Sequence, residues 1–149
     1  MIYLDRLTKY FPMRGGRKVI VENLTATFPT GASVALLGRN GAGKSTLLKL
    51  IAGTIRPTSG QVLSTGSISY PVGFAGSFHA DLTGIQNTRF VARLYGVDTD
   101  DLVDFVQDFA ELGRHFYMPF RTYSAGMKAR LSFGVSMGIP FDTYLVDEV

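Results

Sequence analysis

The stretch that decides the fold runs Gly38-Arg39-Asn40-Gly41-Ala42-Gly43-Lys44-Ser45-Thr46. It fits the pattern G-x-x-x-x-G-K-[ST] of a phosphate-binding loop. An apolar, strand-like run at 33–37 precedes it and a helical run at 47–53 follows it, which is the context that this pattern requires. The sequence therefore predicts a bound nucleoside triphosphate. A glycine-rich turn without a ligand is the weaker interpretation, because four constrained positions and both flanks agree.

The spacing of this loop has a physical reason. Its three glycines let the backbone wrap closely and direct successive N–H groups at one point, which creates an anion-binding nest. Lys44 adds a positive charge, Ser45 offers a hydroxyl to Mg²⁺, and the helix that begins near Thr46 directs its positive dipole end at the phosphates. The predicted nucleotide-binding residues of the loop are Gly38, Arg39, Asn40, Gly41, Ala42, Gly43, Lys44, Ser45 and Thr46.

Composition sets limits on the other classes of function. The chain has 149 residues, 46% of them hydrophobic and 18% charged, which is typical of a globular domain with a real core. It has no apolar run long enough to span a membrane and no secretion signal at its start, so we expect a cytosolic protein. The absence of cysteine excludes disulfides and thiolate metal sites.

The basic residues are concentrated in one half of the chain. Residues 1–60 carry nine Lys or Arg against two Asp or Glu, whereas residues 61–149 carry six against ten. The basic half is the half that has to hold polyphosphate, and it contains no Lys/Arg block. This distribution therefore does not favour a nucleic-acid ligand.

Apolar periodicity and turn residues predict a β-rich start followed by helices. The expected strands lie at 1–11, 18–24, 25–28, 33–37, 61–63, 67–70 and 144–148. The expected helices lie at 47–53, from Asp81 or Thr83 to Gly96, at 98–109, and at 128–137. We predict that the run at 33–37 is a buried strand that leads into the phosphate loop. The acidic helix at 98–109 is interpreted as a solvated face.

Three further features suggest a site. Tyr10 and Phe11 could stack on a nucleotide base or could simply pack in a strand, and their spacing favours neither interpretation. Ser124 is a candidate N-cap, and the helix N-terminus behind it is either a second anion site or, as is more common, an ordinary cap. Asp147 and Glu148 end an apolar strand on opposite sides, so one can serve Mg²⁺ and the other can activate the attacking water.

Three motifs in one order carry a resemblance: G-R-N-G-A-G-K-S-T, then Y-S-A-G-M, then Y-L-V-D-E. The combination resembles the ATP-binding subunit of ABC transporters, and Y-S-A-G-M is similar to a variant of their L-S-G-G-Q signature. The stretches at 70–87, 90–96 and 118–134 resemble the ATPase of bacterial capsular polysaccharide exporters. The resemblance implies an α/β phosphate-loop NTPase fold with an antiparallel β subdomain and a helical subdomain near 82–137.

The resemblance also implies roles for particular residues. Two copies would pack head to tail, and each ATP would lie between the phosphate loop of one copy and Ser124, Ala125 and Gly126 of the other. Tyr10 or Phe11 would stack on adenine. Asp147, with Ser45, would bind Mg²⁺, and Glu148 would be the catalytic base.

A motor of this kind needs partners. The resemblance implies a membrane-spanning permease subunit, contacted by residues 74–95, and a peripheral location on the cytoplasmic side of the inner membrane. The switch histidine of the family is expected about 30 residues beyond Asp147, so we expect 1–149 to be a single ATP-binding domain that is incomplete at its C-terminus and hydrolyses ATP weakly on its own.

Other functions stay open at this point. They are a soluble ABC-type ATPase that acts on nucleic acid or ribosomes, an exporter of another cell-surface polysaccharide, and a phosphate-loop kinase or G protein. The last is disfavoured because the base-reading motif N-K-x-D is missing.

Overall fold

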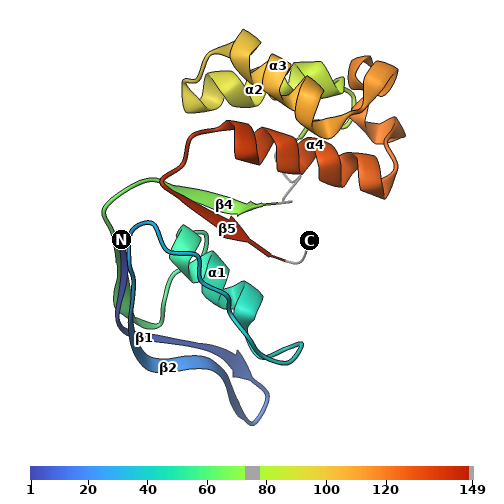
Figure 1. Cartoon of the computed structure of the whole chain (residues 1–149). Coiled ribbons are helices and arrows are strands. Elements are labelled where there is room, and N and C mark those ends of the chain that lie inside the picture. Colours follow the sequence, from blue (N-terminus) through green and yellow to red (C-terminus); the bar gives the residue numbers. More distant parts are fainter. Residues whose placement is uncertain (73–77, 148–149) are drawn as a thin grey trace. The chain divides into compact units, whose positions relative to one another are not determined.

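A computed structural model of the chain describes residues 1–72 and 78–147 (Figure 1). The chain forms two compact units, Met1–Ile68 and Ser69–Val149. The prediction of one ATP-binding domain with a helical subdomain near 82–137 stays a prediction. Among the helices that the structure describes, none combines the length and the apolar character that a membrane crossing requires.

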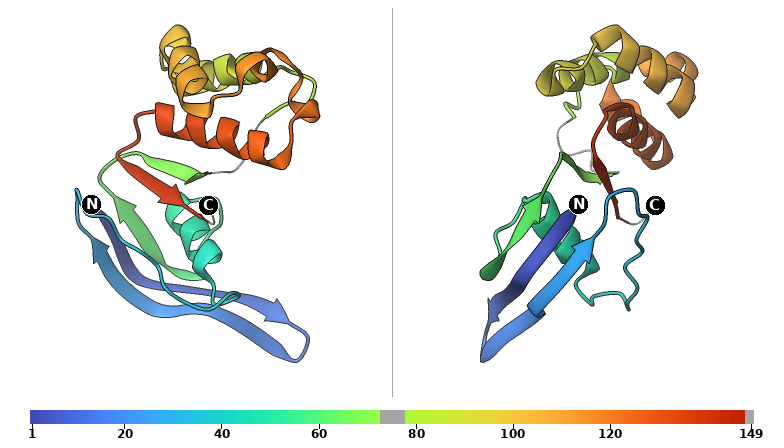
Figure 2. Two further views of the ribbon diagram at one scale, coloured as in Figure 1. Left: turned by 45° about the vertical axis from the view of Figure 1, so that its right-hand side comes forward. Right: turned by 60° about the vertical axis from the view of Figure 1, so that its left-hand side comes forward.

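The first unit contains a three-stranded antiparallel sheet with the order β2-β1-β3 (Figure 2). Its strands are β1 (Ile2–Met13), β2 (Gly16–Phe28) and β3 (Ser59–Ser64). β1 and β2 form a long hairpin in which Met13 pairs with Gly16. The sequence predicted two separate strands at 18–24 and 25–28, but the structure has one. Register shifts in its pairing with β1 interrupt the apolar alternation without ending the strand.

An irregularity in β1 explains which of its residues face the core. Ile2 and Leu4 are buried, and strict alternation would place Arg6 inside next. Arg6 instead has a positive φ of 48°, and the register shifts between Leu4 and Leu7. The extra residue moves Leu7, which is fully buried, into the core in place of the arginine.

Helix α1 (Lys44–Ala52) completes the first unit. It buries Leu48, Leu50 and Ile51. It ends at Gly53, whose left-handed conformation lets the backbone N–H groups that follow the helix donate to its last carbonyls. The predicted helix after the phosphate loop is therefore confirmed.

The predicted buried strand at 33–37 is wrong. The structure has no strand there, and Val34 and Leu37 are 55% and 92% exposed. A strand makes no hydrogen bonds of its own, so an apolar run becomes one only beside a partner strand. Within the described residues, no strand pairs with this run.

The second unit combines a two-stranded sheet with a group of helices. Strands β4 (Ile68–Val72) and β5 (Thr143–Val146) run side by side, and their arrows point the same way (Figures 1 and 2). The pair is tied by a buried hydrogen bond of 2.9 Å from the backbone N–H of Leu145 to the hydroxyl of Ser69. The helices are α2 (Gly84–Tyr95), α3 (Thr99–Ala110) and α4 (Ala125–Gly138), with 3₁₀ turns at Gly113–Tyr117 and Phe120–Thr122.

Each of the three helices begins at a residue that caps it with its own side chain. Thr83 and Gln86 form a reciprocal capping box at α2, Asp98 accepts from Asp101 at α3, and Ser124 accepts from Met127 at α4. The predicted helix starts are thus confirmed. The helices share one hydrophobic core, in which Val106, Phe116 and Leu131 are almost fully buried.

Candidate nucleotide-binding site

The phosphate loop connects residues 33–37 to α1 in the first unit. Gly41 and Gly43 have φ angles of 82° and 98°, in the left-handed region that side chains disfavour. The backbone N–H of Ala42 donates to the carbonyl of Arg39 at 3.0 Å, which closes a tight turn inside the loop. Two of the three glycines predicted to let the backbone wrap thus adopt the backbone geometry that only glycine adopts readily.

Gly43 is also fixed by a tertiary contact. A Cβ atom at this position would lie 2.5 Å from Cγ2 of Ile20 on β2. The start of α1 thereby packs directly against the β1–β2 hairpin, and any larger residue at position 43 would have to displace Ile20. The sequence pattern gave no signal for Ile20, because its role depends on a contact between distant segments.

The N-terminus of α1 has free hydrogen-bond donors. Its N-cap, Gly43, offers no side chain, and its first turn contains no acidic residue. The first intrahelical bond runs from Leu47 N–H to the Gly43 carbonyl at 2.9 Å, so the N–H groups of the preceding turn have no acceptor within the helix. Together with the helix dipole, these donors form a positive end that suits an anion.

Lys44 brings the two ends of the loop together. Its ammonium group donates to the carbonyl of Gly38 at 2.6 Å. An ammonium group has three N–H donors, so this bond leaves two for another acceptor. Lys44, Ser45 and Thr46 are half-buried, whereas Arg39, Asn40 and Ala42 are exposed. The loop thus presents backbone donors and one cation to the same place, which is the arrangement that a polyphosphate requires.

Tyr10 and Phe11 lie in the same unit as the loop, on β1. The Arg17 guanidinium lies over the Tyr10 ring, 4.5 Å from its centroid, and the Lys9 ammonium lies 4.9 Å from the centroid of Phe11. Tyr10 pairs with Val19, the neighbour of the Ile20 that contacts Gly43. The aromatic pair therefore belongs to the hairpin on which α1 begins, and one face of each ring carries a cation.

The predicted signature residues lie at the start of α4 in the second unit. Ser124 accepts a hydrogen bond from the N–H of Met127 at 3.2 Å, which is an ordinary N-cap. Ser124, Ala125 and Gly126 are all exposed, and a Cβ atom at Gly126 would meet no heavy atom within 4 Å. This helix start is therefore open on its outer side.

Tyr123 anchors this helix start from within. It is 5% exposed, and its hydroxyl donates to the carbonyl of His115 at 2.6 Å. Burial raises the pKa of Tyr123 above its usual value. The exposed signature residues thus directly follow a buried, hydrogen-bonded tyrosine in the chain.

The predicted magnesium ligands fall in different units. Ser45 belongs to the first, and Asp147, half-buried directly after β5, belongs to the second. Glu148, the predicted catalytic base, lies outside the described residues. Within residues 1–72 and 78–147, no three His, Asp or Glu side chains form a cluster that could hold a metal.

Comparison with known proteins agrees with this geometry. The profile of the ABC transporter family matches residues 21–149. The chain belongs to the ABC transporter family. As a member of it, the protein is an ATP-binding ATPase subunit, as the motif order predicted.

The relatives of this ABC ATPase include proteins that are named for the transport or export of a polysaccharide. It is 50% identical to the polysialic acid transport ATP-binding protein KpsT of Escherichia coli, over the whole chain and 69% of the relative. It is 44% identical to the capsule polysaccharide export ATP-binding protein CtrD of Neisseria meningitidis serogroup B, and 45% identical to the ATP-binding protein BexA of Haemophilus influenzae. In both cases it again covers 69% of the relative.

Solved structures agree with the fold of the ABC ATPase. An ATP-binding subunit of an ABC transporter superimposes with a TM-score of 0.83 at 22% identity, covering 99% of this chain and 66% of that one. The dimeric, post-hydrolysis form of the cassette MJ0796, bound to ADP and Pi, gives a TM-score of 0.78 at 21% identity, covering 93% and 69%. The predicted ABC-type fold, with antiparallel strands and a helical part, is confirmed.

Proposed function

We propose that this ABC ATPase is the motor subunit of an exporter that moves capsular polysaccharide across the inner membrane. The observation that carries the proposal is 44–50% identity, over the whole chain, to proteins named for polysialic acid transport and capsule polysaccharide export. Relatives with cargoes of another kind are more distant: the O-antigen export protein RfbB of Klebsiella pneumoniae is 40% identical over 93% of the chain.

The phosphate loop would hold the ATP phosphates. Its backbone donors, the open start of α1 and the remaining donors of Lys44 all suit a polyanion. Tyr10 or Phe11 would stack on adenine through the ring face that the Arg17 or Lys9 cation leaves uncovered. This chain's own residues thereby supply both phosphate binding and base binding from one unit.

Hydrolysis would need the carboxylates that follow β5. Ser45 and Asp147 offer the hydroxyl and carboxylate oxygens that Mg²⁺ prefers, and the ion would neutralise charge on the phosphates. Glu148 would accept the proton of the attacking water. In a Glu148→Gln variant we expect ATP binding to persist and turnover to fall, so normal turnover would remove Glu148 from this role.

Two copies would work as a pair. Ser124, Ala125 and Gly126 are exposed at a helix N-terminus, where they can approach a nucleotide held by another copy. The dimeric state of MJ0796 supports such an arrangement. The ATP would then be enclosed between the phosphate loop of one copy and the signature of the next.

A membrane-spanning permease would be the second partner. That subunit would cross the inner membrane, and this ATPase would bind it peripherally on the cytoplasmic side. The proposed contact at residues 74–95 lies partly outside the described residues. In its described part, α2 exposes Phe90 and Leu94, by 51% and 64%, as a protein contact would require.

The nucleotide part of the proposal is tested by binding of a fluorescent ATP analogue to the purified chain. Lys44→Ala removes the cation that bridges the loop, and we expect at least about tenfold weaker binding. Lys49→Ala is the matched control, because Lys49 is an exposed lysine in the last turn of the same helix. Equal affinity in the two variants would contradict the assignment of Lys44.

The cargo is tested by a chimaera in which residues 1–149 replace the matching part of KpsT in an E. coli strain lacking that gene. We expect polysialic acid at the cell surface, detected by antibody, and its loss when the chimaera carries Lys44→Ala. A second chimaera, in which residues 1–149 replace the matching part of RfbB, tests the alternative cargo in a strain lacking RfbB. Restored O-antigen export by this chimaera, without restored capsule by the first, would assign the other class of polysaccharide.

A further inference from the structure

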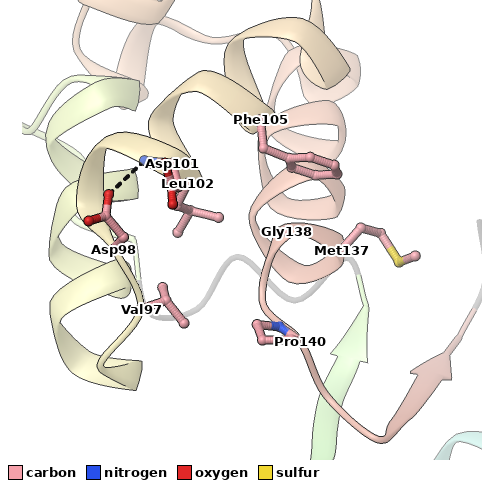
Figure 3. A pocket seen from close by; sticks show the side chains of 8 residues that line it. All are labelled: Val97, Asp98, Asp101, Leu102, Phe105, Met137, Gly138 and Pro140. Atoms are coloured by element: carbon pink, nitrogen blue, oxygen red, sulfur yellow. Dashed lines mark hydrogen bonds between the residues drawn. The ribbon is translucent and has the colours of Figure 1, made fainter.

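A groove between α3 and α4 is lined by residues other than those assigned to nucleotide binding. It is a hollow of about 380 Å³ at the start of α3 and the end of α4, and its lining includes Asp98, Asp101, Phe105, Met137 and Pro140 (Figure 3). Figure 3 shows the Phe105 ring lying against the last turn of α4, beside Gly138. We call this hollow, with the aromatic stack described next, the α3 groove.

The floor of the α3 groove extends along α3 as a stack of aromatic rings. Phe105 and Phe109 stack at 5.5 Å between centroids, and Phe109 and Phe133 stack at 5.8 Å. Phe105 and Phe109 nevertheless remain 40% and 45% exposed. The helices approach closely enough for this stack because α4 presents glycine beneath each ring: a Cβ atom at Gly138 would lie 2.7 Å from Phe105, and one at Gly134 would lie 3.3 Å from Phe109.

Carboxylates line one border of this apolar floor. Asp101, Asp104 and Asp108 follow one another at spacings of three and four residues on α3, so they form a stripe on one face of the helix, next to Phe105 and Phe109. Asp98 stands at the open end, where its side chain accepts from the N–H of Asp101. Like charges at these spacings repel one another and destabilise the helix.

The described part of the chain does not neutralise this border. In the described part of the chain, ion pairs join Arg6 to Asp5 and Arg121 to Asp81, and none involves an aspartate of α3. Arg130 of α4 comes close to the end of α3, but it donates to the carbonyl oxygens of Ala110 and Glu111. The groove therefore presents exposed rings beside uncompensated negative charge.

We propose that the α3 groove docks a basic amphipathic helix of a partner protein. The apolar face of such a helix would cover the stacked rings, and its Lys or Arg side chains would meet the aspartates. The twelve residues of α3 extend for about 18 Å, so a partner helix of about three turns would fit. The negative border repels anionic lipid and nucleic acid, which excludes both as occupants.

The proposal is tested on the purified full chain with a fluorescent 14-residue peptide in which Leu forms one helical face and Lys the other. Fluorescence anisotropy should detect binding that weakens as salt is raised. A peptide of the same pattern with Glu in place of Lys should not bind. Binding of both peptides with equal affinity would overturn the charge argument.

Matched variants locate the binding. Asp104→Asn combined with Asp108→Asn should weaken the Lys peptide at least about tenfold. Glu22→Gln combined with Asp81→Asn changes the net charge by the same amount at exposed positions outside the groove, and it should leave the affinity unchanged. Equal losses in the two double variants would overturn the proposal.

The aromatic floor has its own control. Phe109→Ala should weaken peptide binding, whereas Tyr117→Ala removes an exposed ring of the 3₁₀ turn Gly113–Tyr117 and should not. Circular dichroism melts would establish that both variants are folded. If Phe109→Ala does not fold, the double variant Asp104→Asn with Asp108→Asn, which changes only exposed side chains, still decides the test. A self-association in analytical ultracentrifugation that Asp104→Asn with Asp108→Asn abolishes would assign the groove to a second copy and overturn the partner helix.

Discussion

Helices α1 and α4 begin in opposite ways. α1 starts at Gly43, which is left-handed, carries no side-chain cap and is followed by a turn without acidic residues. α4 starts at Ser124, which is extended and accepts a hydrogen bond from Met127. Both starts belong to motifs that resemble ATP-contacting segments, yet only at α4 does a side chain of the protein accept from one of the free N–H groups.

The difference separates a binding terminus from a structural one. Of the four α-helices that the structure describes, α2, α3 and α4 begin with a side-chain cap, and α1 does not. A capped start has already used part of its hydrogen-bonding capacity. We therefore expect the α1 loop to be the main source of nucleotide affinity, and the start of α4 to matter for turnover rather than for binding by a single copy.

The largest expected effect comes from Gly43→Ala. The substitution forces a side chain into a left-handed conformation and against Ile20, so we expect a loss of about 2 kcal/mol or more in the free energy of unfolding, with ATP binding weakened at least about tenfold. Urea unfolding and titration with the ATP analogue measure the two effects. Gly41→Ala is the control, because it carries the same kind of strain in open space and should cost less.

Tyr123→Phe should be next in size. It leaves the His115 carbonyl without its donor, which should cost about 1–2 kcal/mol of unfolding free energy while ATP binding stays unchanged. Because burial raises the pKa of Tyr123 in the folded state, its contribution is complete below the unfolded pKa of about 10 and is lost as pH rises through the folded value. Wild type should thus lose more stability than the variant between pH 8 and strongly alkaline pH in urea unfolding. An equal loss in both would contradict this role.

Ser124→Ala tests the cap itself. Removing the acceptor for Met127 N–H should cost about 1 kcal/mol of unfolding free energy, as for caps in general. The matched substitution Thr83→Ala at α2 should cost a similar amount, because it likewise removes the hydroxyl that accepts from a backbone N–H three residues on. Thermal denaturation of the two variants measures this, and a loss of ATP-analogue affinity in Ser124→Ala alone would break the distinction between α1 and α4.

The smallest effect on the free energy of unfolding is expected from Gly126→Ala, which should stabilise the protein where the other substitutions destabilise it. A Cβ atom has open space at this helical position, so stability should rise by about 0.5 kcal/mol. If Gly126 faces a nucleotide on another copy, ATP turnover should fall although the protein becomes more stable. Calorimetry together with a phosphate-release assay gives both numbers, and unchanged turnover would contradict the role of Gly126 in the pair.

The sequence predicted the helices well because their starts and ends depend on local chemistry. Thr83, Asp98 and Ser124 cap through bonds to residues three positions on, and Gly53 and Gly96 end helices through their own left-handed conformation. The strands were predicted less well. The run at 33–37 has the composition of a strand but no partner strand in the described part of the chain, and Arg6 changes the alternation of β1 through a bulge that the pattern does not reveal.

By itself, the sequence determined the phosphate loop, the order of the three motifs and hence the family, because each motif is a short stretch whose chemistry is complete within a few residues. Only the tertiary structure decided that Gly43 rests on Ile20, that Tyr123 anchors α4 through His115, and that glycines of α4 hold the aromatic floor of the α3 groove. These features depend on contacts between segments far apart in the chain, and side-chain packing rather than local propensity fixes them.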